Sequence, residues 1–213
     1  MIFYAFLLVF SGYVMVNISR VSLISRLPAS IVKNLGSHGE MIGHNAHDIL
    51  RKYRTSNVNR VLIGSLNINS LASKIDDLRI IIDKNLDILT IQETKLDSSF
   101  PDSQFSINGF KNPPYRLDRN RRGGGVLIYI REDIPSRKLT KHSFNKPNES
   151  LFIEINLRKT KLLFCGTYHS KHPIYGSNDV DYFKEIGQAL DIYSNYDKFL
   201  LAGDFNTEES NDT

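Results

Sequence analysis

Cysteine is nearly absent from this chain of 213 residues, which contains only Cys165. A single thiol excludes an intramolecular disulfide and any metal cluster built from several cysteines. Cys165 ends the apolar run that starts at Leu162, so we expect a buried and inert thiol. This cysteine usage favours a reducing compartment, and we expect an intracellular protein of the nucleus or the cytoplasm.

Basic residues are missing before the apolar stretch 1–16, where a cleavable signal peptide would carry them. As a helix the stretch would reach about 24 Å, short of the ~30 Å hydrocarbon core of a membrane. A membrane anchor, a signal and a translated extension without a folded role all stay open for residues 1–18. Residues 19–57 are polar and without a sustained period, which predicts a linker with solvated histidines.

Net charge is also low, at +4, but it is unevenly placed. Between Lys111 and Lys138 there are eight basic residues and three acidic ones. Such a segment suits the phosphate backbone of a nucleic acid, with a merely solvated loop as the alternative. The candidate nucleic-acid-binding residues are four arginines: Arg116, Arg119, Arg121 and Arg122.

The chain has a globular composition, with 41% hydrophobic and 23% charged residues, and one folded domain is predicted over residues 58–213. Its first part predicts a strand over Val61–Leu66, a helix from a capping box at Ser73 and Asp76 to about Asn85, and a strand over Asp87–Ile91. This order is a βαβ unit, which pairs its two strands in parallel.

The second part of the domain is rich in predicted strands. Gly123–Gly125 leads into a strand over Val126–Ile130, either as a tight turn or as a nest for phosphate. Residues 151–157 alternate and predict a strand with one wet face, paired with 162–168. A helix follows from Asp181, and a buried strand over Phe199–Ala202 ends the pattern.

Polar residues stand where these strands end. Asn67, Glu93 and Asp204 each follow an apolar run, and Asn206 stands two residues after Asp204. In open α/β sheets the chemistry lies at the carboxyl ends of strands, so these side chains are predicted to meet. Asp204 and Asn206 would both face the cleft if the backbone between them stays extended.

Four motifs, in order, carry a family resemblance: Leu66–Leu71, Ile91–Thr94, Arg122–Val126 and Gly203–Asn206. With them the chain resembles the endonuclease/exonuclease/phosphatase superfamily, and within it the apurinic-endonuclease-like domain of non-LTR (LINE-type) retrotransposons. The resemblance covers residues 61–213. It implies a four-layer α/β sandwich, with two mixed sheets packed face to face and helices outside.

The resemblance also implies the chemistry. Glu93 would bind Mg²⁺, with Mn²⁺ as the alternative, and Asn67 would stand beside the metal. Tyr168 would contact the scissile phosphate, while Asp204 and Asn206 would orient the attacking water. The substrate would be DNA, and a reverse transcriptase domain would be the partner in a parent polyprotein.

One departure affects the expected activity. The family carries a Ser-Asp-His motif beyond Gly-Asp-Phe-Asn, and this chain ends seven residues after Asn206 without it. We therefore expect a fold incomplete at its C-terminus, with an unpaired apolar sheet edge and weak or no nicking. A catalytically silent nucleic-acid-binding remnant and a phosphatase of the same superfamily are the alternatives.

Overall fold

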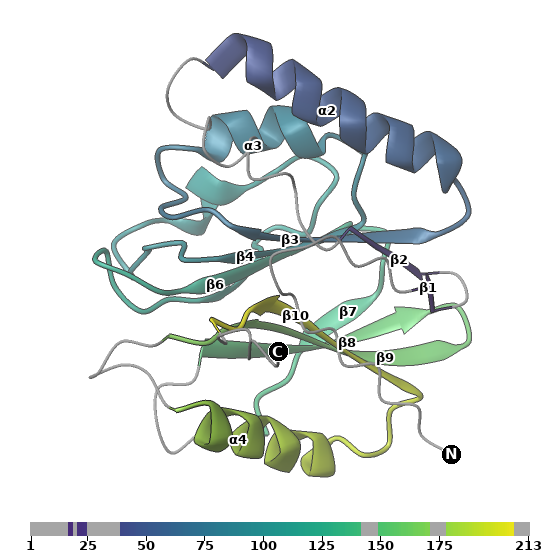
Figure 1. The fold of residues 1–213 in the computed structure, drawn as a ribbon, viewed down its shortest axis with the longest axis vertical. Helices are drawn as coiled ribbons and strands as arrows, with labels where there is room; N and C mark the ends of the chain where they lie inside the picture. Colours follow the sequence, from purple (N-terminus) through teal and green to yellow (C-terminus); the bar gives the residue numbers. More distant parts are fainter. Residues whose placement is uncertain (1–16, 19–20, 25–38, 142–148, 171–177, 207–213) are drawn as a thin grey trace, which may run out of the picture.

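The computed structural model describes residues 17–18, 21–24, 39–141, 149–170 and 178–206 (Figure 1). The strands of the described part are β1 (Asn17–Ile18), β2 (Val21–Ile24), β3 (Val61–Asn67), β4 (Ile88–Gln92), β5 (Tyr115–Leu117), β6 (Val126–Ile130), β7 (Ser136–Lys138), β8 (Glu149–Leu157), β9 (Thr160–Tyr168) and β10 (Lys198–Asp204). The helices are α2 (Gly39–Ser56), α3 (Ile75–Ile82), α4 (Asp179–Ile192) and the short 3₁₀ helix η1 (Asp102–Phe105).

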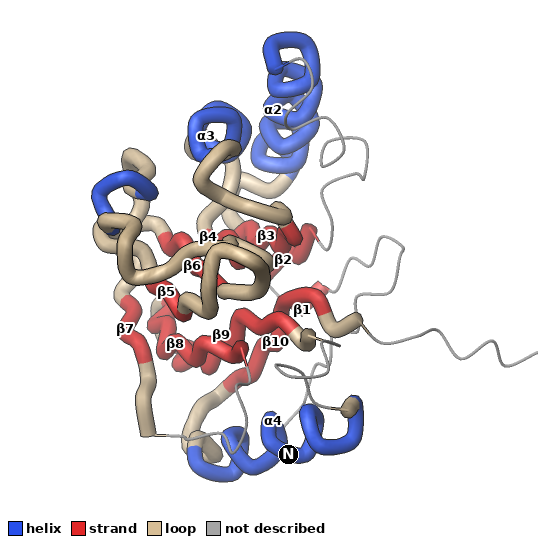
Figure 2. The backbone as a smooth tube through the Cα atoms, turned by 90° about the vertical axis from the view of Figure 1, so that its left-hand side faces the viewer, coloured by secondary structure: helices blue, strands red, loops and turns tan. Residues whose placement is uncertain are grey.

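These elements form four layers. One sheet has the strand order β1-β2-β3-β4-β6-β5 and the other β10-β9-β8-β7. Both are mixed, because each combines parallel with antiparallel pairs. Helices α2 and α3 lie outside the first sheet and α4 lies outside the second (Figures 1 and 2). The predicted α/β sandwich is therefore confirmed.

Two parallel strand pairs position the candidate site. β3 and β4 run in parallel, with Asn67 opposite Gln92 at their last paired position. β9 and β10 also run in parallel, with Asp204 opposite Tyr168. The carboxyl ends of all four strands lie at the same end of the sandwich, because Asn67 at the end of β3 hydrogen-bonds to Asp204 at the end of β10.

The core lies in three layers of buried apolar side chains. Between the sheets, Ile63, Ile128 and Phe164 are fully buried, which explains why β6 is an unbroken apolar run. The outer clusters join the first sheet to α2 and α3, and the second sheet to α4. Cys165 lies in the α4 cluster and is buried, as predicted.

Three local predictions differ from the structure. Much of the predicted linker is α2, an 18-residue helix whose Leu50 is fully buried against α3. Helix α3 begins at Ile75 without a side-chain cap, so the capping box at Ser73 and Asp76 is wrong. The second face of β8 is mostly covered by α4, because Phe152 packs in the α4 cluster and Glu154 is only 6% exposed, while Asn156 is exposed as predicted.

The predicted apolar N-terminal segment lies outside the described residues, apart from β1. Within the part of the chain that the structure describes, no helix is long and apolar enough to cross a membrane. In the same part, β10 forms one edge of its sheet and has a single neighbouring strand in that sheet, β9.

Candidate active site

The amide of Asn67 joins the two sheets at the candidate site. Its Nδ2 donates to Glu93 Oε1 at 2.9 Å and to Asp204 Oδ2 at 2.8 Å. The three residues stand at or just past the ends of β3, β4 and β10, so the structure brings together the three side chains that the strand-end pattern singled out. One amide group between two carboxylates offsets part of their mutual repulsion, since both accept its protons.

Glu93 occupies its place through an unusual backbone conformation. Its φ is +53°, which a non-glycine residue adopts at a cost of about 1–3 kcal/mol. The carbonyl oxygen of the same residue accepts the Ser70 amide at 2.8 Å, which ties the turn after β4 to the turn after β3. This turn directs the Glu93 carboxylate towards β9 and β10 instead of along its own sheet.

Tyr168 completes the inner part of the site. Its hydroxyl donates to Glu93 Oε1 at 3.0 Å. Burial raises the pKa of this hydroxyl above its ordinary value, and the neighbouring carboxylates of Glu93 and Asp204 raise it further. Tyr168 therefore remains a proton donor at neutral pH and well above it.

The end of β10 is held against the end of β9 by backbone contacts. Asn206 has φ of +46°, so the chain does not stay extended after Asp204, contrary to the premise of the sequence prediction. The Asn206 amide N–H donates to Asp204 Oδ1 at 3.1 Å, and its side chain donates to the His169 carbonyl at 2.8 Å. Asn206 thus anchors Asp204 and the neighbouring loop.

His169 was not predicted as a site residue, and the structure places it beneath this turn. It is 1% exposed, and its ring Nδ1 lies 2.8 Å from the Phe205 carbonyl. Its backbone N–H donates to the Asp204 carbonyl at 2.8 Å. The local sequence does not predict that His169 supports this turn, because its position depends on the parallel register of β9 and β10.

Gly203 is required by the close approach of β10 to β9. A Cβ atom at this position would lie 1.9 Å from the Thr167 carbonyl oxygen, closer than any non-bonded contact allows. The glycine of Gly-Asp-Phe-Asn therefore permits the strand pairing that places Asp204 beside Tyr168.

A buried ion pair supports the floor of the site. Arg119 Nη1 donates to Glu149 Oε1 at 2.6 Å, with the side chains 13% and 6% exposed. Glu149 lies opposite Tyr168 in the β8–β9 ladder and also accepts the Gly125 amide. Burial raises the pKa of Glu149, while Gly125 and Arg119 counteract the shift.

Gly123 and Gly124 of the Gly-Gly-Gly motif make room for this ion pair, and Gly125 makes room for Thr94. Gly124 and Gly125 have φ of +69° and +91°, and a Cβ atom at Gly124 would lie within 2.5 Å of both Arg119 and Glu149. The Gly125 amide binds a carboxylate of the protein itself, which favours a structural turn over the alternative of a phosphate nest.

Two lysines beside the site were also missed. Lys95 donates to Asn69 Oδ1, and Lys74 donates to the carbonyls of Ile68 and Asn69 at 2.5 and 3.0 Å. Burial and the charge of Lys95 lower the pKa of Lys74. Both lysines flank the turn that follows Asn67, where they add positive charge near the two carboxylates.

The donor set fits a hard divalent cation that keeps part of its water shell. Within the described residues, no cluster of three or more His, Cys, Asp or Glu side chains could hold a metal ion. Mg²⁺ is usually bound by one or two carboxylates together with waters and substrate phosphate. Glu93 supplies such a carboxylate, since only its Oε1 carries hydrogen bonds among the described residues.

Three of the four predicted nucleic-acid-binding arginines are paired with acids of the chain itself. Arg119 forms the ion pair with Glu149 described above. Arg116 is 10% exposed and forms ion pairs with Asp102 and Asp118, each at 2.6 Å. Arg121 is more exposed, at 61%, and pairs with Asp97 at 3.0 Å. The charges of these three arginines are therefore matched by acids, whereas Arg122 is exposed and makes no ion pair with a described residue. The local excess of basic residues is thus a weaker argument for nucleic-acid binding.

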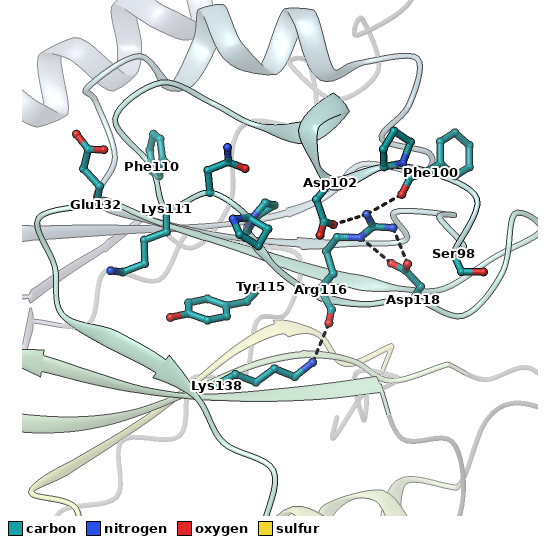
Figure 3. A pocket seen from close by; sticks show the side chains of 14 residues that line it. Ser98, Phe100, Asp102, Phe110, Lys111, Tyr115, Arg116, Asp118, Glu132 and Lys138 are labelled. Atoms are coloured by element: carbon teal, nitrogen blue, oxygen red, sulfur yellow. Dashed lines mark hydrogen bonds and ion pairs between the residues drawn. The ribbon is translucent and has the colours of Figure 1, made fainter.

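Arg116 also borders a groove of about 1070 Å³ between the sheet edges β5 and β7, away from the site. Figure 3 shows its guanidinium between Asp102 and Asp118, while Lys138 reaches the Arg116 carbonyl at 3.0 Å. The contact of Lys138 in β7 with Arg116 in β5 joins the two sheets at this edge.

Comparisons with known proteins agree with the fold. The model of the endonuclease/exonuclease/phosphatase family matches residues 64–213. No curated protein sequence matches the chain at a significant level.

Several solved structures are similar. The 3′ phosphatase NExo from Neisseria, bound to a product DNA hairpin, is 21% identical over 68% of this chain and 57% of that chain, with a TM-score of 0.50. Truncated TDP2 from Caenorhabditis elegans is 17% identical over 68% of this chain and 62% of that chain, with a TM-score of 0.51. An AP endonuclease from Archaeoglobus fulgidus is 18% identical over 68% of this chain and 57% of that chain, with a TM-score of 0.49. The chain therefore spans about three-fifths of the length of these proteins. The likeness to NExo and to TDP2 shows the fold alone.

Proposed function

Because the chain belongs to the endonuclease/exonuclease/phosphatase family, we propose that its strand ends carry a divalent-metal-dependent site for cleaving phosphodiester bonds in DNA. The observation that carries the proposal is the double hydrogen bond from Asn67 to Glu93 and Asp204. It unites an amide and two carboxylates from both sheets around one point.

Each residue has a role that its contacts support. Glu93 and Asn67 would hold Mg²⁺, or alternatively Mn²⁺, and the ion would neutralise charge on the phosphate. Tyr168, protonated at neutral pH, can donate to a phosphate oxygen. Asp204 is held by Asn206 so that its carboxylate can accept a hydrogen bond from the attacking water.

We also propose that this domain derives from a LINE-type retrotransposon. The Asn-Ile-Asn-Ser, Gln-Glu-Thr and Gly-Gly-Gly spellings support it, with a reverse transcriptase domain as the partner in the parent polyprotein. The genomic reading frame downstream tests it. Codons for Ser-Asp-His and a reverse transcriptase would support the proposal, while an unrelated domain there would contradict it.

Cleavage is tested by plasmid nicking with Mg²⁺, using the full chain. We expect weak nicking, because the Ser-Asp-His residues of the family are not among these 213 residues. Asp204→Ala and Tyr168→Phe should each abolish the nicking that the parent chain shows. Asp191→Ala changes an exposed acid on α4 and is the matched control, so equal activity in all variants would refute the site.

Metal binding is tested without activity by thermal unfolding. If Mg²⁺ binds with a Kd near 1 mM, 10 mM stabilises the folded chain by about 1.4 kcal/mol. That corresponds to a rise of about 3–6 °C in Tm for a chain of this size. The rise should disappear in Glu93→Gln and persist in Glu185→Gln, a change on the helix α4.

A phosphatase is the second candidate, favoured by the similarity to a structure described as a 3′ phosphatase. A DNA oligonucleotide with a 3′ phosphate separates the two activities. Release of inorganic phosphate without strand cleavage would favour the phosphatase. Binding of DNA without either reaction would favour a catalytically silent remnant.

A further inference from the structure

A second cleft lies at the opposite ends of the strands that carry the candidate active site. It has a volume of about 840 Å³ and is bordered by the first residues of β3 and β10, Val61 and Lys198. β3 has seven residues, and at ~3.3 Å per residue its two ends are about 20 Å apart. The cleft is therefore separate from the site at Asn67.

Positive charge dominates the lining of this cleft. Two acids line it, Asp87 and Asp133, together with six basic residues: Arg54, Arg60, Arg131, Arg158, Lys159 and Lys198. Six basic and two acidic residues give the lining a formal charge of +4, which equals the net charge of the whole chain. A pocket with such a surplus attracts anions, because its walls exclude water and strengthen the field.

Both acids are already engaged with the same arginine. Asp87 is 5% exposed and receives Arg54 at 2.7 Å and Arg131 at 2.8 Å. It also accepts the Leu62 amide at 2.6 Å. Asp133 forms an ion pair with Arg131 as well. The acids of the cleft therefore neutralise its deepest arginines and leave the rim positive.

The rim is formed by side chains that make no ion pair within the described residues: Arg158, Lys159 and Lys198. Arg158 and Lys159 form the two-residue turn between β8 and β9, where Leu157 pairs with Thr160. Such turns favour Asn and Gly because they require positive φ, and Arg158 adopts φ of +55°. An arginine here is conformationally unfavourable, so its charge is not explained by the turn.

The floor of the cleft is aliphatic. Ile134, Leu162 and Leu200 are buried at its base, at the open end of the core between the sheets. Val58, which is 69% exposed, stands at its border. None of the described residues that line the cleft is aromatic, so it offers no platform on which a nucleic-acid base could stack.

We propose that this cleft binds an acidic peptide segment of a partner protein, with an aliphatic side chain on the floor and carboxylates at the rim. Charge complementarity selects the acidic groups, and the floor of Ile134, Leu162 and Leu200 selects an aliphatic residue over a base. The volume lies within the usual range for ligand pockets, ~300–1,000 Å³, and suits a few residues.

Fluorescence anisotropy with the full chain tests the proposal, and the probe is a labelled peptide of sequence Asp-Glu-Leu-Asp-Glu-Leu. We expect saturable binding that weakens as salt increases. Reversal of the three rim charges (Arg158→Glu, Lys159→Glu and Lys198→Glu) should weaken it by roughly tenfold or more. A probe with Ser in place of both Leu residues should also bind less tightly.

The matched control reverses three exposed charges that do not line the cleft: Arg122→Glu, Lys141→Glu and Lys184→Glu. It changes the net charge equally and should leave peptide affinity within about twofold. Equal losses in both triple variants, or tighter binding of a single-stranded oligonucleotide at the rim, would overturn the proposal. Circular dichroism of each variant verifies the fold, and Val58→Glu, at an exposed position, offers a second disruption of the same cleft.

Discussion

The buried pair of Arg119 and Glu149 should be energetically coupled, and its removal can be measured. Both side chains are at most 13% exposed and are joined at 2.6 Å. Glu149→Gln would keep an acceptor for the Gly125 amide but would leave the guanidinium of Arg119 buried without its counter-charge. Breaking a buried pair from one side costs about 3–5 kcal/mol, and the retained acceptor places our expectation near 3 kcal/mol.

Removal of the other partner, Arg119, should reduce the free energy of unfolding less at low pH than at high pH. In Arg119→Met the carboxyl of Glu149 can take up a proton, because burial already raises its pKa. A group whose pKa is raised in the folded state stabilises it most below the unfolded pKa, and that contribution is lost as pH rises through the folded pKa. The variant should therefore be closer to the parent chain at pH 5 than at pH 8.

Urea unfolding of four proteins completes the test: the parent chain, both single variants, and the Arg119→Met/Glu149→Gln double variant. The double variant should lose about 2 kcal/mol less than the sum of the single losses at pH 8. Losses that add to within about 0.5 kcal/mol would refute the coupling. Arg137→Met is a useful comparison, since its ion pair is exposed on one side.

Two further predictions concern stability. Hydrogen bonds from Arg137, and then from Tyr196 and Lys161, lower the pKa of Glu154 to about 2. The stabilisation from the ionised Glu154 should therefore be present above pH 4.5 and lost as pH falls towards 2, and acid unfolding of Glu154→Gln should lack this step. Gly203→Ala should destabilise the chain by more than about 2 kcal/mol in urea, because of the Thr167 carbonyl, whereas Gly187→Ala in α4 has open space and should be neutral or stabilising by up to ~1 kcal/mol. Comparable losses in both glycine variants would contradict the steric argument.

The strand ends were predictable because one physical rule governs them. Apolar runs mark buried strands, and polar residues directly after them must lie at a sheet end. Asn67, Glu93 and Asp204 follow this rule, and their hydrogen bonds show the convergence. Their roles in metal binding and catalysis stay predictions.

The contacts that the sequence did not predict join residues that are far apart along the chain. Glu149 lies 30 residues after Arg119, and their contact needs both the β8–β9 register and the glycine turn. His169 gains its position from the end of β10 and from stacking on Tyr182 of α4. Helix α2 did leave a signal, since Ile42, Ala46, Leu50 and Tyr53 recur at helical spacing among polar residues.

The two carboxylates of the site arrive on different halves of the sandwich. Glu93 belongs to the sheet under α2 and α3, and Asp204 to the sheet over α4. A folding intermediate with only one half formed would therefore hold a single acid and could not assemble the pair. The two hydrogen bonds by which Asn67 joins Glu93 to Asp204 would then form only at the last docking step, when both halves have met.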